Sequence, residues 1–463
     1  MPLKARGVIL RDVEVDGCGG LDVRLEAGRI AEIGAGLAGR GEELDGKGGA
    51  LIPGLADHHI HLFGLAAQAA SVELAGVATA AQFAARIAEA VAGRPPGAWV
   101  RVTGYHEAMA GELTRAELDA LAPRHRLRVQ HQTGALWVLN SLALAALGEG
   151  EAPPGFEPET GRLWRGDAWL RGRIGAEPPP LAPIGRQLAA YGITALTDAS
   201  VTTDADAAGR LAQAVRDGAL PQRLTLMSGG ALSAPDDGAF AVGPVKVLLD
   251  DHDLPDLDEF AGRIAQARAW GRGVAVHCVT AGELAVTLAA FEAAGARAGD
   301  RIEHGGVIPA EAVAQLKAME LTVVTQPGFI RERGDRYAAE VPAEEQPDLY
   351  RCASLKAAGV PVAGSSDAPY ASADPWAAMT AAIDRRTAGG RVIGETERIG
   401  PAAALALYLG RPEAPGGPPR RVAVGEPADL CLLAAPLRET LAAPSAGLVR
   451  ATIQGGRITY SAA

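Results

Sequence analysis

Eight short β-rich runs alternate with Ala-, Leu- and Arg-rich helical runs through most of this 463-residue chain. Parallel strands joined by crossover helices give this alternation, and eight such strands close a (β/α)8 barrel. The runs occupy residues 50–61, 193–199, 223–229, 244–250, 273–279, 300–306, 321–327 and 360–369. The sequence therefore predicts an α/β fold built on a TIM barrel over residues 51–414.

The strand count passes over a long segment between the first and second runs. This segment, about 95–185, holds two further strand-like runs, "AWVRVTGY" and "RLRVQHQTG", and Pro-rich stretches such as "EAPPGFEPETG". Proline-rich stretches interrupt helices and strands and mark connections. We expect the segment to be an insertion after the first barrel strand.

The two ends of the chain resemble each other. Residues 1–50 and 415–463 consist of strand-like runs separated by glycine-rich turns, as in "LDVRLEAGRIAEIG" and "VRATIQGGRITY". The second segment follows a run of helix and strand breakers, "RPEAPGGPPRR". The two ends are predicted to form one small β-sandwich domain.

Charge and hydropathy limit the partners. The formal net charge of −11 gives no electrostatic reason to expect nucleic acid or an anionic membrane. No apolar run reaches the roughly 18 residues of a membrane span, and the first residues alternate like a strand, unlike a signal peptide. We expect a cytoplasmic protein with no nucleic-acid and no membrane partner; a homodimer is left open.

The cysteines offer no framework for the fold. Cys18, Cys278, Cys352 and Cys431 are widely scattered, without paired spacing. This spacing indicates neither disulfides nor a cysteine zinc site, and it predicts buried small hydrophobic side chains.

Three histidines stand within four residues in "GLADHHIHLFG", although the chain has only nine. On a strand, successive side chains alternate between faces, so His59 and His61 share one face and His58 points to the other. Two imidazoles on one face make half of a metal site. A histidine-rich loop without a ligand is the alternative.

The other half of a metal site is found at later strand ends. His277 ends the fifth predicted strand, His304 ends the sixth, Asp367 follows the eighth, and Lys246 lies in the fourth. The active sites of barrel enzymes lie at the carboxyl ends of the strands. Four histidines and an aspartate converging on one barrel mouth predict a metal centre.

Two of these residues have ordinary alternative roles. Asp367 stands in "SSDAP", which also resembles the start of a helix, so it could be a helix cap. Lys246 could make a salt bridge, or its aliphatic side chain could carry the ammonium group to the protein surface. However, an unpaired ammonium within "VKVLL" would be costly to bury.

The motifs "PGLADHHIH", "VKVLLD", "AVHCV", "RIEHGG", "TQPGF" and "GSSDAP" resemble those of the amidohydrolase superfamily, over nearly the whole chain. Within it, "RIEHGGVIP", "VVTQPGFI" and "ALWVLNSLALAALG" are similar to the branch that includes N-substituted formamide deformylase. The resemblance implies that His59 and His61 bind one metal ion and that His277 and His304 bind a second. It further implies that Lys246 is a carbamylated bridge and that Asp367 is both a ligand and the proton shuttle.

The chemistry that such a site would perform is hydrolysis. Imidazoles and a carboxylate suit Zn²⁺, and the same set would accept Fe²⁺, Mn²⁺ or Co²⁺. One or two such ions would activate water as a hydroxide nucleophile, and Asp367 would pass its proton to a leaving nitrogen. We expect hydrolysis of a C–N bond in a small-molecule amide or formamide. A deaminase of an aminated heterocycle, or a non-catalytic barrel serving in binding or assembly, are the alternatives.

The remaining histidines and one glycine motif receive weaker interpretations. "GAGLAG" at 34–39 matches a phosphate-binding pattern, but no helix follows it, so it is expected to be a turn. His58, His125 and His252 are expected in solvent or behind the ligands. Tyr105, His106, His131 and Trp137 are candidate substrate contacts if the insertion covers the barrel mouth; a structural role is the alternative.

Overall fold

The computed structural model describes residues 7–39, 41–148, 150–174 and 179–462. The chain divides into two compact units, 1–62 with 181–463, and 63–180. We call the first the barrel unit and the second the insertion unit. The range of about 95–185 expected for an insertion covers most of the second unit, which itself begins at Phe63.

The barrel unit contains an eight-stranded parallel sheet, in which each strand pairs with the next along the chain. This confirms the predicted α/β barrel. Its strands are β6 (Leu55–Ile60), β13 (Ile193–Asp198), β14 (Arg223–Ser228), β15 (Ala241–Val247), β16 (Val274–Cys278), β17 (Arg301–His304), β18 (Thr322–Thr325) and β19 (Val362–Gly364).

The first predicted run, 50–61, is two strands and not one. Its first part is β5 (Leu51–Pro53), which pairs with a strand near the C-terminus, and only its second part, β6, enters the barrel. Gly54 separates the two. A Cβ on this glycine would lie 2.2 Å from the Thr194 side chain, so the close approach of β6 to β13 requires a residue without a side chain.

The first and last barrel strands meet through the residues that follow β19. Asp367 N donates to His59 O at 2.8 Å, and His61 N donates to Ala368 O at 2.8 Å. These two bonds bring the segment after β19 alongside the end of β6. The barrel is therefore closed at the end that carries the histidines.

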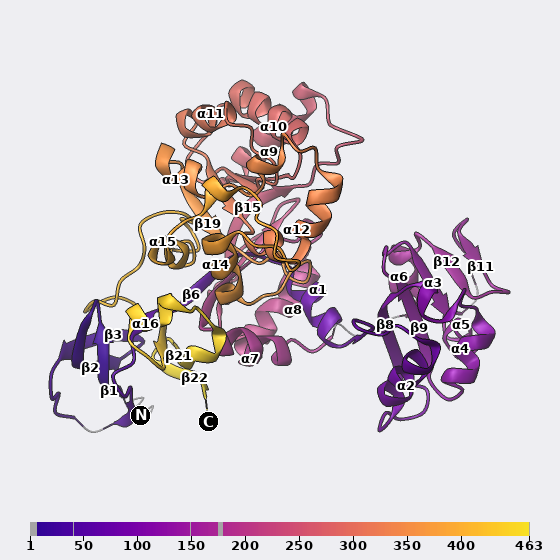
Figure 1. The fold of residues 1–463 in the computed structure, drawn as a ribbon, viewed down its shortest axis with the longest axis horizontal. Helices are drawn as coiled ribbons and strands as arrows, with labels where there is room; N and C mark the ends of the chain where they lie inside the picture. Colours follow the sequence, from indigo (N-terminus) through magenta and orange to yellow (C-terminus); the bar gives the residue numbers. More distant parts are fainter. Residues whose placement is uncertain (1–6, 40, 149, 175–178, 463) are drawn as a thin grey trace. The chain divides into compact units, whose positions relative to one another are not determined.

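Helices surround the sheet (Figure 1): one precedes β13, and others follow most of the barrel strands, although β14 leads directly to β15. They are α7 (Ala182–Ala190), α8 (Ala205–Arg216), α9 (Leu257–Ala269), α10 (Ala281–Ala294), α11 (Ala312–Ala318), α12 (Gly328–Glu340), α13 (Ala353–Ala358), α14 (Pro375–Asp384) and α15 (Pro401–Ala406). Within the described ranges, none is both long and apolar enough to cross a bilayer.

The start of α10 illustrates how the sequence fixes these helices. Thr280 Oγ1 accepts the Glu283 N–H at 3.1 Å, and the Glu283 carboxylate accepts the Thr280 N–H at 3.1 Å. This capping box satisfies two backbone groups that the first helical turn leaves unpaired. It also fixes the short connection that follows His277 in β16.

The two chain ends form two facing four-stranded sheets, as predicted. One contains β1 (Val8–Val15), β2 (Cys18–Glu26), β3 (Arg29–Gly34) and β4 (Glu42–Asp45); the other contains β5, β20 (Leu430–Leu433), β21 (Val449–Gln454) and β22 (Arg457–Ser461). Val23 and Leu25 of the first sheet and Leu430 and Ile453 of the second belong to one buried apolar cluster. Cys18 is exposed on β2, contrary to the expectation that every cysteine is buried.

The insertion unit has its own six-stranded sheet, in the order β11-β12-β10-β9-β8-β7. Its strands are β7 (Val72–Glu73), β8 (Trp99–Tyr105), β9 (Arg126–His131), β10 (Leu136–Leu139), β11 (Phe156–Glu157) and β12 (Arg162–Trp164). Its helices include α2 (Ala80–Val91), α3 (Glu107–Ala110), α4 (Arg115–Leu121) and α6 (Asp167–Ile174). A buried cluster that includes Phe83, Val100 and Leu127 forms its own apolar core.

Candidate metal centre

Two of the three histidines in and just after β6 face the barrel interior. His59 is fully buried, and the side chain of His61, one residue beyond the strand, is 23% exposed. His61 Nδ1 lies 3.0 Å from Ser200 Oγ, and Ser200 N donates to Asp198 Oδ1 at 3.0 Å. Residues that follow β13 therefore hold the His61 ring.

His58 points to the opposite face of β6 and is fully buried, with no hydrogen-bond partner for either ring nitrogen. Burial lowers the pKa of its imidazole to about 3. Of the two expected places for His58, in solvent or behind the ligands, the first is excluded because the outer face of this strand is covered. His252 is exposed, and His125 is buried with Nε2 3.2 Å from Arg94 O.

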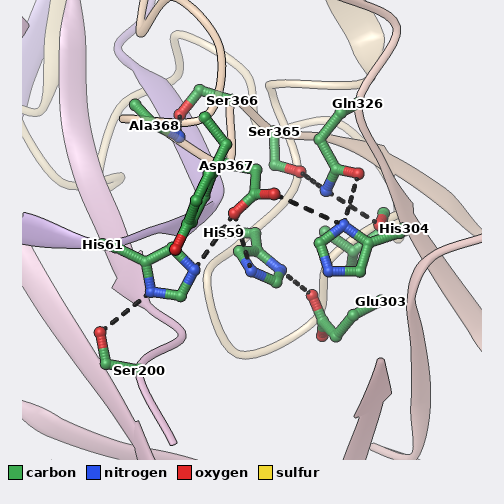
Figure 2. A network of polar contacts seen from close by, with 12 residues as sticks. His59, His61, Ser200, Glu303, His304, Gln326, Ser365, Ser366, Asp367 and Ala368 are labelled. Atoms are coloured by element: carbon green, nitrogen blue, oxygen red, sulfur yellow. Dashed lines mark hydrogen bonds and ion pairs between the residues drawn. The ribbon is translucent and has the colours of Figure 1, made fainter. Parts of the chain in front are cut away.

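Asp367 lies at the centre of the site (Figure 2). Its Oδ1 is 3.1 Å from His61 Nε2 and 3.4 Å from His59 Nε2, and its Oδ2 is 3.7 Å from His304 Nδ1. The nearest helix, α14, begins at Pro375 and is capped by Asp374. Asp367 is therefore not a helix cap.

A carboxylate that the sequence analysis missed orients His59. Glu303 Oε2 contacts His59 Nδ1, and the other oxygen of Glu303 is paired with Arg301. An anionic partner at Nδ1 holds the proton there, so Nε2 carries the lone pair that faces Asp367. The sequence did contain a sign of this role, because Glu303 stands within the motif "RIEHGG", next to the predicted ligand His304.

Gln326 orients His304 in the same way. The Gln326 amide donates through Nε2 to Ser365 Oγ at 2.9 Å, and its Oε1 lies 2.9 Å from His304 Nδ1. Since Oε1 can only accept, Nδ1 carries the proton and Nε2 of His304 is free to bind a cation. Gln326 was quoted within "TQPGF" but was given no role.

His304 and Asp367 both have left-handed backbone conformations, with φ of 71° and 54°. Such conformations are costly for residues other than glycine and tend to cluster at functional sites. At His304 the consequence is visible, because Glu303 and His304 are adjacent in sequence and yet both face His59. Regular strand alternation would place them on opposite faces.

His277 and Lys246 complete the interior of the barrel end. The ring centroids of His277 and His304 are 4.4 Å apart. Lys246 is buried, and its Nζ has no hydrogen-bond partner. Burial lowers the pKa of the Lys246 ammonium, and the positive charge of Lys246 contributes to the lowered pKa of His59, His277 and His304.

Burial favours the neutral, metal-binding form of His59, His277 and His304. Burial is the main cause that lowers the pKa of His59 and His304 well below the usual range, and it lowers the pKa of His277 to about 4. Neutral imidazoles offer a lone pair instead of a second proton. The ring nitrogens are therefore available as ligands at neutral pH.

The spacing of the donor atoms fits one small cation. One ligand atom from each of His59, His304 and Asp367 lies within 4.8 Å of the others. Two ligands of a tetrahedral ion stand about 3.3 Å apart when each bond is about 2.0–2.1 Å long. The separations of 3.1 and 3.4 Å between Asp367 Oδ1 and the two imidazoles of β6 match this value.

The four residues named as substrate contacts all lie in the insertion unit. Tyr105 donates its hydroxyl to Gly111 O at 2.6 Å, and Trp137, which is 3% exposed, donates Nε1 to Asp167 at 2.8 Å. His106 and His131 lie together, with ring centroids 5.8 Å apart. Tyr105 and Trp137 thus have structural partners within their own unit.

Sequence comparison places these features in a known context. A model described as the amidohydrolase family matches residues 42–460. N-substituted formamide deformylase of Arthrobacter pascens is 24% identical over 461 aligned residues, covering 84% of this chain and 85% of that protein. The protein LONG AFTER FAR-RED 3 of Arabidopsis thaliana is 33% identical over 129 residues, but the match spans only 22% of its length.

Comparison with solved structures supports the fold. An uncharacterised metal-dependent hydrolase from Pyrococcus furiosus superposes with a TM-score of 0.74 at 21% identity. The match covers 91% of this chain and 97% of that one. The likeness therefore extends to the insertion as well as to the barrel.

Proposed function

Because this chain belongs to the amidohydrolase family, and is by that membership a metal-dependent hydrolase, we propose that it cleaves a C–N bond, of the amide or formamide type, in a small molecule. The observation that carries the proposal is the position of Asp367 Oδ1, 3.1 Å from His61 Nε2 and 3.4 Å from His59 Nε2, at the carboxyl end of the barrel.

The side chains present fit a divalent transition-metal ion. His59 Nε2, Asp367 Oδ1 and Lys246 Nζ are all buried without a hydrogen-bond partner. Buried polar atoms are rarely left in this state, and a cation would satisfy the first two. Imidazole and carboxylate ligands suit Zn²⁺ and also Fe²⁺, Mn²⁺ and Co²⁺.

We assign the ligand set to His59, His61, His277, His304 and Asp367. Such an ion, when bound, supplies a water of lowered pKa and polarises the carbonyl group that is attacked. Glu303 and Gln326 support this set by keeping the ring protons of His59 and His304 on Nδ1.

Asp367 is assigned as the group that moves the proton. Its carboxylate is anchored through its own backbone N–H, which donates to His59 O at 2.8 Å. A carboxylate held in this position can accept a proton from the attacking water and deliver it to the leaving nitrogen. The products would be a carboxylate and an amine.

Lys246 is assigned as a carbamate bridge between two ions. Desolvation favours its neutral amine, which can attack CO₂: an N–C bond forms as one C=O π pair moves to oxygen, the nitrogen loses a proton to water, and an anionic carbamate results. This anion would replace an unpaired buried ammonium with a ligand for two cations. The assignment therefore accounts for the missing partner of Nζ.

A panel of substrates tests the proposal. N-formyl amines are included because a relative is an N-substituted formamide deformylase, together with N-acyl amines, cyclic amides and aminated heterocycles. Metal-loaded protein should release an amine with a carboxylate from at least one amide. The His59→Ala/His61→Ala variant should lose this activity and most of the metal held in the barrel, and replacing the exposed His252 should change neither.

Two results would overturn the proposal. Release of ammonia from aminated heterocycles alone would identify a deaminase that uses the same site. Full hydrolytic activity in protein that metal analysis finds free of transition metals would exclude the assigned ligand set.

A further inference from the structure

We propose that the insertion unit carries a metal site of its own, formed by His106, Glu107 and His131, that binds one divalent transition-metal ion independently of the barrel. Within the residues that the structure describes, this is the one other trio of histidine, cysteine or acidic side chains spaced to hold an ion. None of these three residues contributes to the ligand set assigned in the barrel.

The topology of the insertion sheet brings the three residues together. β8 and β9 are parallel neighbours, and their last residues, Tyr105 and His131, pair with each other. His106 follows Tyr105 directly, and Glu107 is the first residue of α3. The site thus lies at the carboxyl ends of two adjacent parallel strands, where side chains from both converge.

The distances are those of a partly assembled coordination sphere. His131 Nε2 lies 3.2 Å from Glu107 Oε2, close to the roughly 3.3 Å that separates two ligands of a tetrahedral ion. One nitrogen of each imidazole and one carboxylate oxygen all lie within 4.8 Å of one another. His106 is the outlying member, because its Nδ1 is 4.0 Å from Glu107 Oε2 and the ring would have to move inward when an ion binds.

An ion would have to displace one ring proton. His131 Nδ1 accepts the Thr133 N–H at 3.2 Å and also lies 2.8 Å from Thr133 Oγ1. The proton of this ring therefore stands on Nε2, 3.2 Å from Glu107 Oε2, and a cation held by Glu107 would take its place. His106 Nδ1 accepts the Ala108 N–H at 3.0 Å as the cap of α3. That helix has only four residues, so little structure depends on this cap if the ring turns.

The site is accessible from solvent. The side chains of His106 and Glu107 are 44% and 47% exposed, whereas that of His131 is 14% exposed. Glu107 and His131 also line a cavity of about 100 Å³, with Tyr105, Arg162 and Trp164. This cavity gives room for a water or a small ligand at the open coordination position that two histidines and one glutamate leave.

The test uses the full-length chain and Zn²⁺ alone as the probe. In a His59→Ala/His304→Ala background, which disables the barrel site, calorimetric titration should still find one equivalent of Zn²⁺ bound. Adding His131→Ala should abolish this equivalent, and adding Glu107→Gln should weaken it, because the anionic ligand is lost. Replacing the exposed His252 in the same background is the matched control and should leave the bound equivalent of Zn²⁺ unchanged.

A second measurement covers the case in which the background protein does not fold. Wild-type protein and the single variant His131→Ala are dialysed against the same Zn²⁺ solution, and the variant should hold one equivalent less. Equal zinc content in the two proteins, or retention of the equivalent after His131→Ala in the background, overturns the proposal. Loss of activity in the barrel variants bears only on the proposed function, so the two results are separable.

Discussion

Asp57 and Ser366 join the first barrel strand to the segment after the last one through two hydrogen bonds, and the buried Asp57 carboxylate accepts a third from His59 of its own strand. Ser366 Oγ donates to Asp57 Oδ2 at 2.5 Å, and the backbone N–H groups of Ser366 and His59 donate to Oδ1 at 3.1 and 3.2 Å. The residue after Ser366 is Asp367, so this link positions the proposed proton shuttle. Burial raises the pKa of Asp57 to about 6 in spite of these donors.

Asp57→Asn should change how stability depends on pH. The folded pKa of Asp57 lies above its unfolded value of 3.8, so its contribution is full below about pH 4 and is lost as the pH rises through 6. Wild-type protein should therefore lose stability relative to the variant over this window, by an amount on the order of 3 kcal/mol. Urea unfolding at several pH values measures the difference. A constant difference would show that Asp57 is ionised with its ordinary pKa.

His58→Leu should change how stability depends on pH below the unfolded pKa of histidine, 6.5. The folded pKa of His58, about 3, lies below its unfolded value of 6.5, so only the unfolded chain takes up this proton between those values. Wild-type protein should lose up to about 1.4 kcal/mol more per pH unit than the variant as the pH falls through this window. The same substitution at the exposed His252 should leave the slope unchanged. Parallel slopes for wild type and His58→Leu would contradict the prediction.

Glu303→Gln should weaken metal binding without removing a ligand. Gln keeps the shape of the side chain but loses the charge that holds the His59 proton on Nδ1. Removing such a partner typically costs about 10- to 100-fold in metal affinity. Competition with a chelator measures the dissociation constant, and Glu311→Gln, at an exposed position, is the control. An unchanged constant would mean that Glu303 only supports the packing around Arg301.

Asp367→Asn should lower kcat by at least about 10², since general acid–base groups typically contribute 10² to 10⁴. Much of the metal should stay bound, because the four histidines remain. Steady-state kinetics and metal analysis on the same preparation separate the two effects, with the exposed Asp253→Asn as the control. Unchanged kcat would remove Asp367 from the reaction.

Lys246→Ala distinguishes a two-metal site from a one-metal site. If the carbamate bridges two ions, the variant should lose the second ion and most of the activity. Added bicarbonate should raise the activity of wild-type protein reconstituted from the metal-free state and have no effect on the variant. The exposed Lys356→Ala should behave as wild type. Two ions in the barrel, counted in a His131→Ala background, and normal kcat in Lys246→Ala would leave Lys246 as a structural residue.

The barrel could be predicted from sequence because its strands are short apolar runs bounded by turn residues. Each of the eight runs overlaps a barrel strand, although β15 begins three residues before the run 244–250. His59 and His61 could be placed on one face by alternation alone. Glu303 could not, because the left-handed backbone at His304 places two adjacent side chains on the same side. Nor could the link between Asp57 and Ser366, which lie more than 300 residues apart in the chain.

Pairing of the chain ends has a consequence for synthesis on the ribosome. β5 needs β20 as its hydrogen-bonding neighbour, and the apolar face of the first sheet is covered by strands that end at Ser461. At about 5–20 residues per second, β5 emerges roughly 20 to 75 s before β20. Throughout that time the nascent N-terminal strands present an uncovered apolar face, which exposes them to aggregation until the last strands are made.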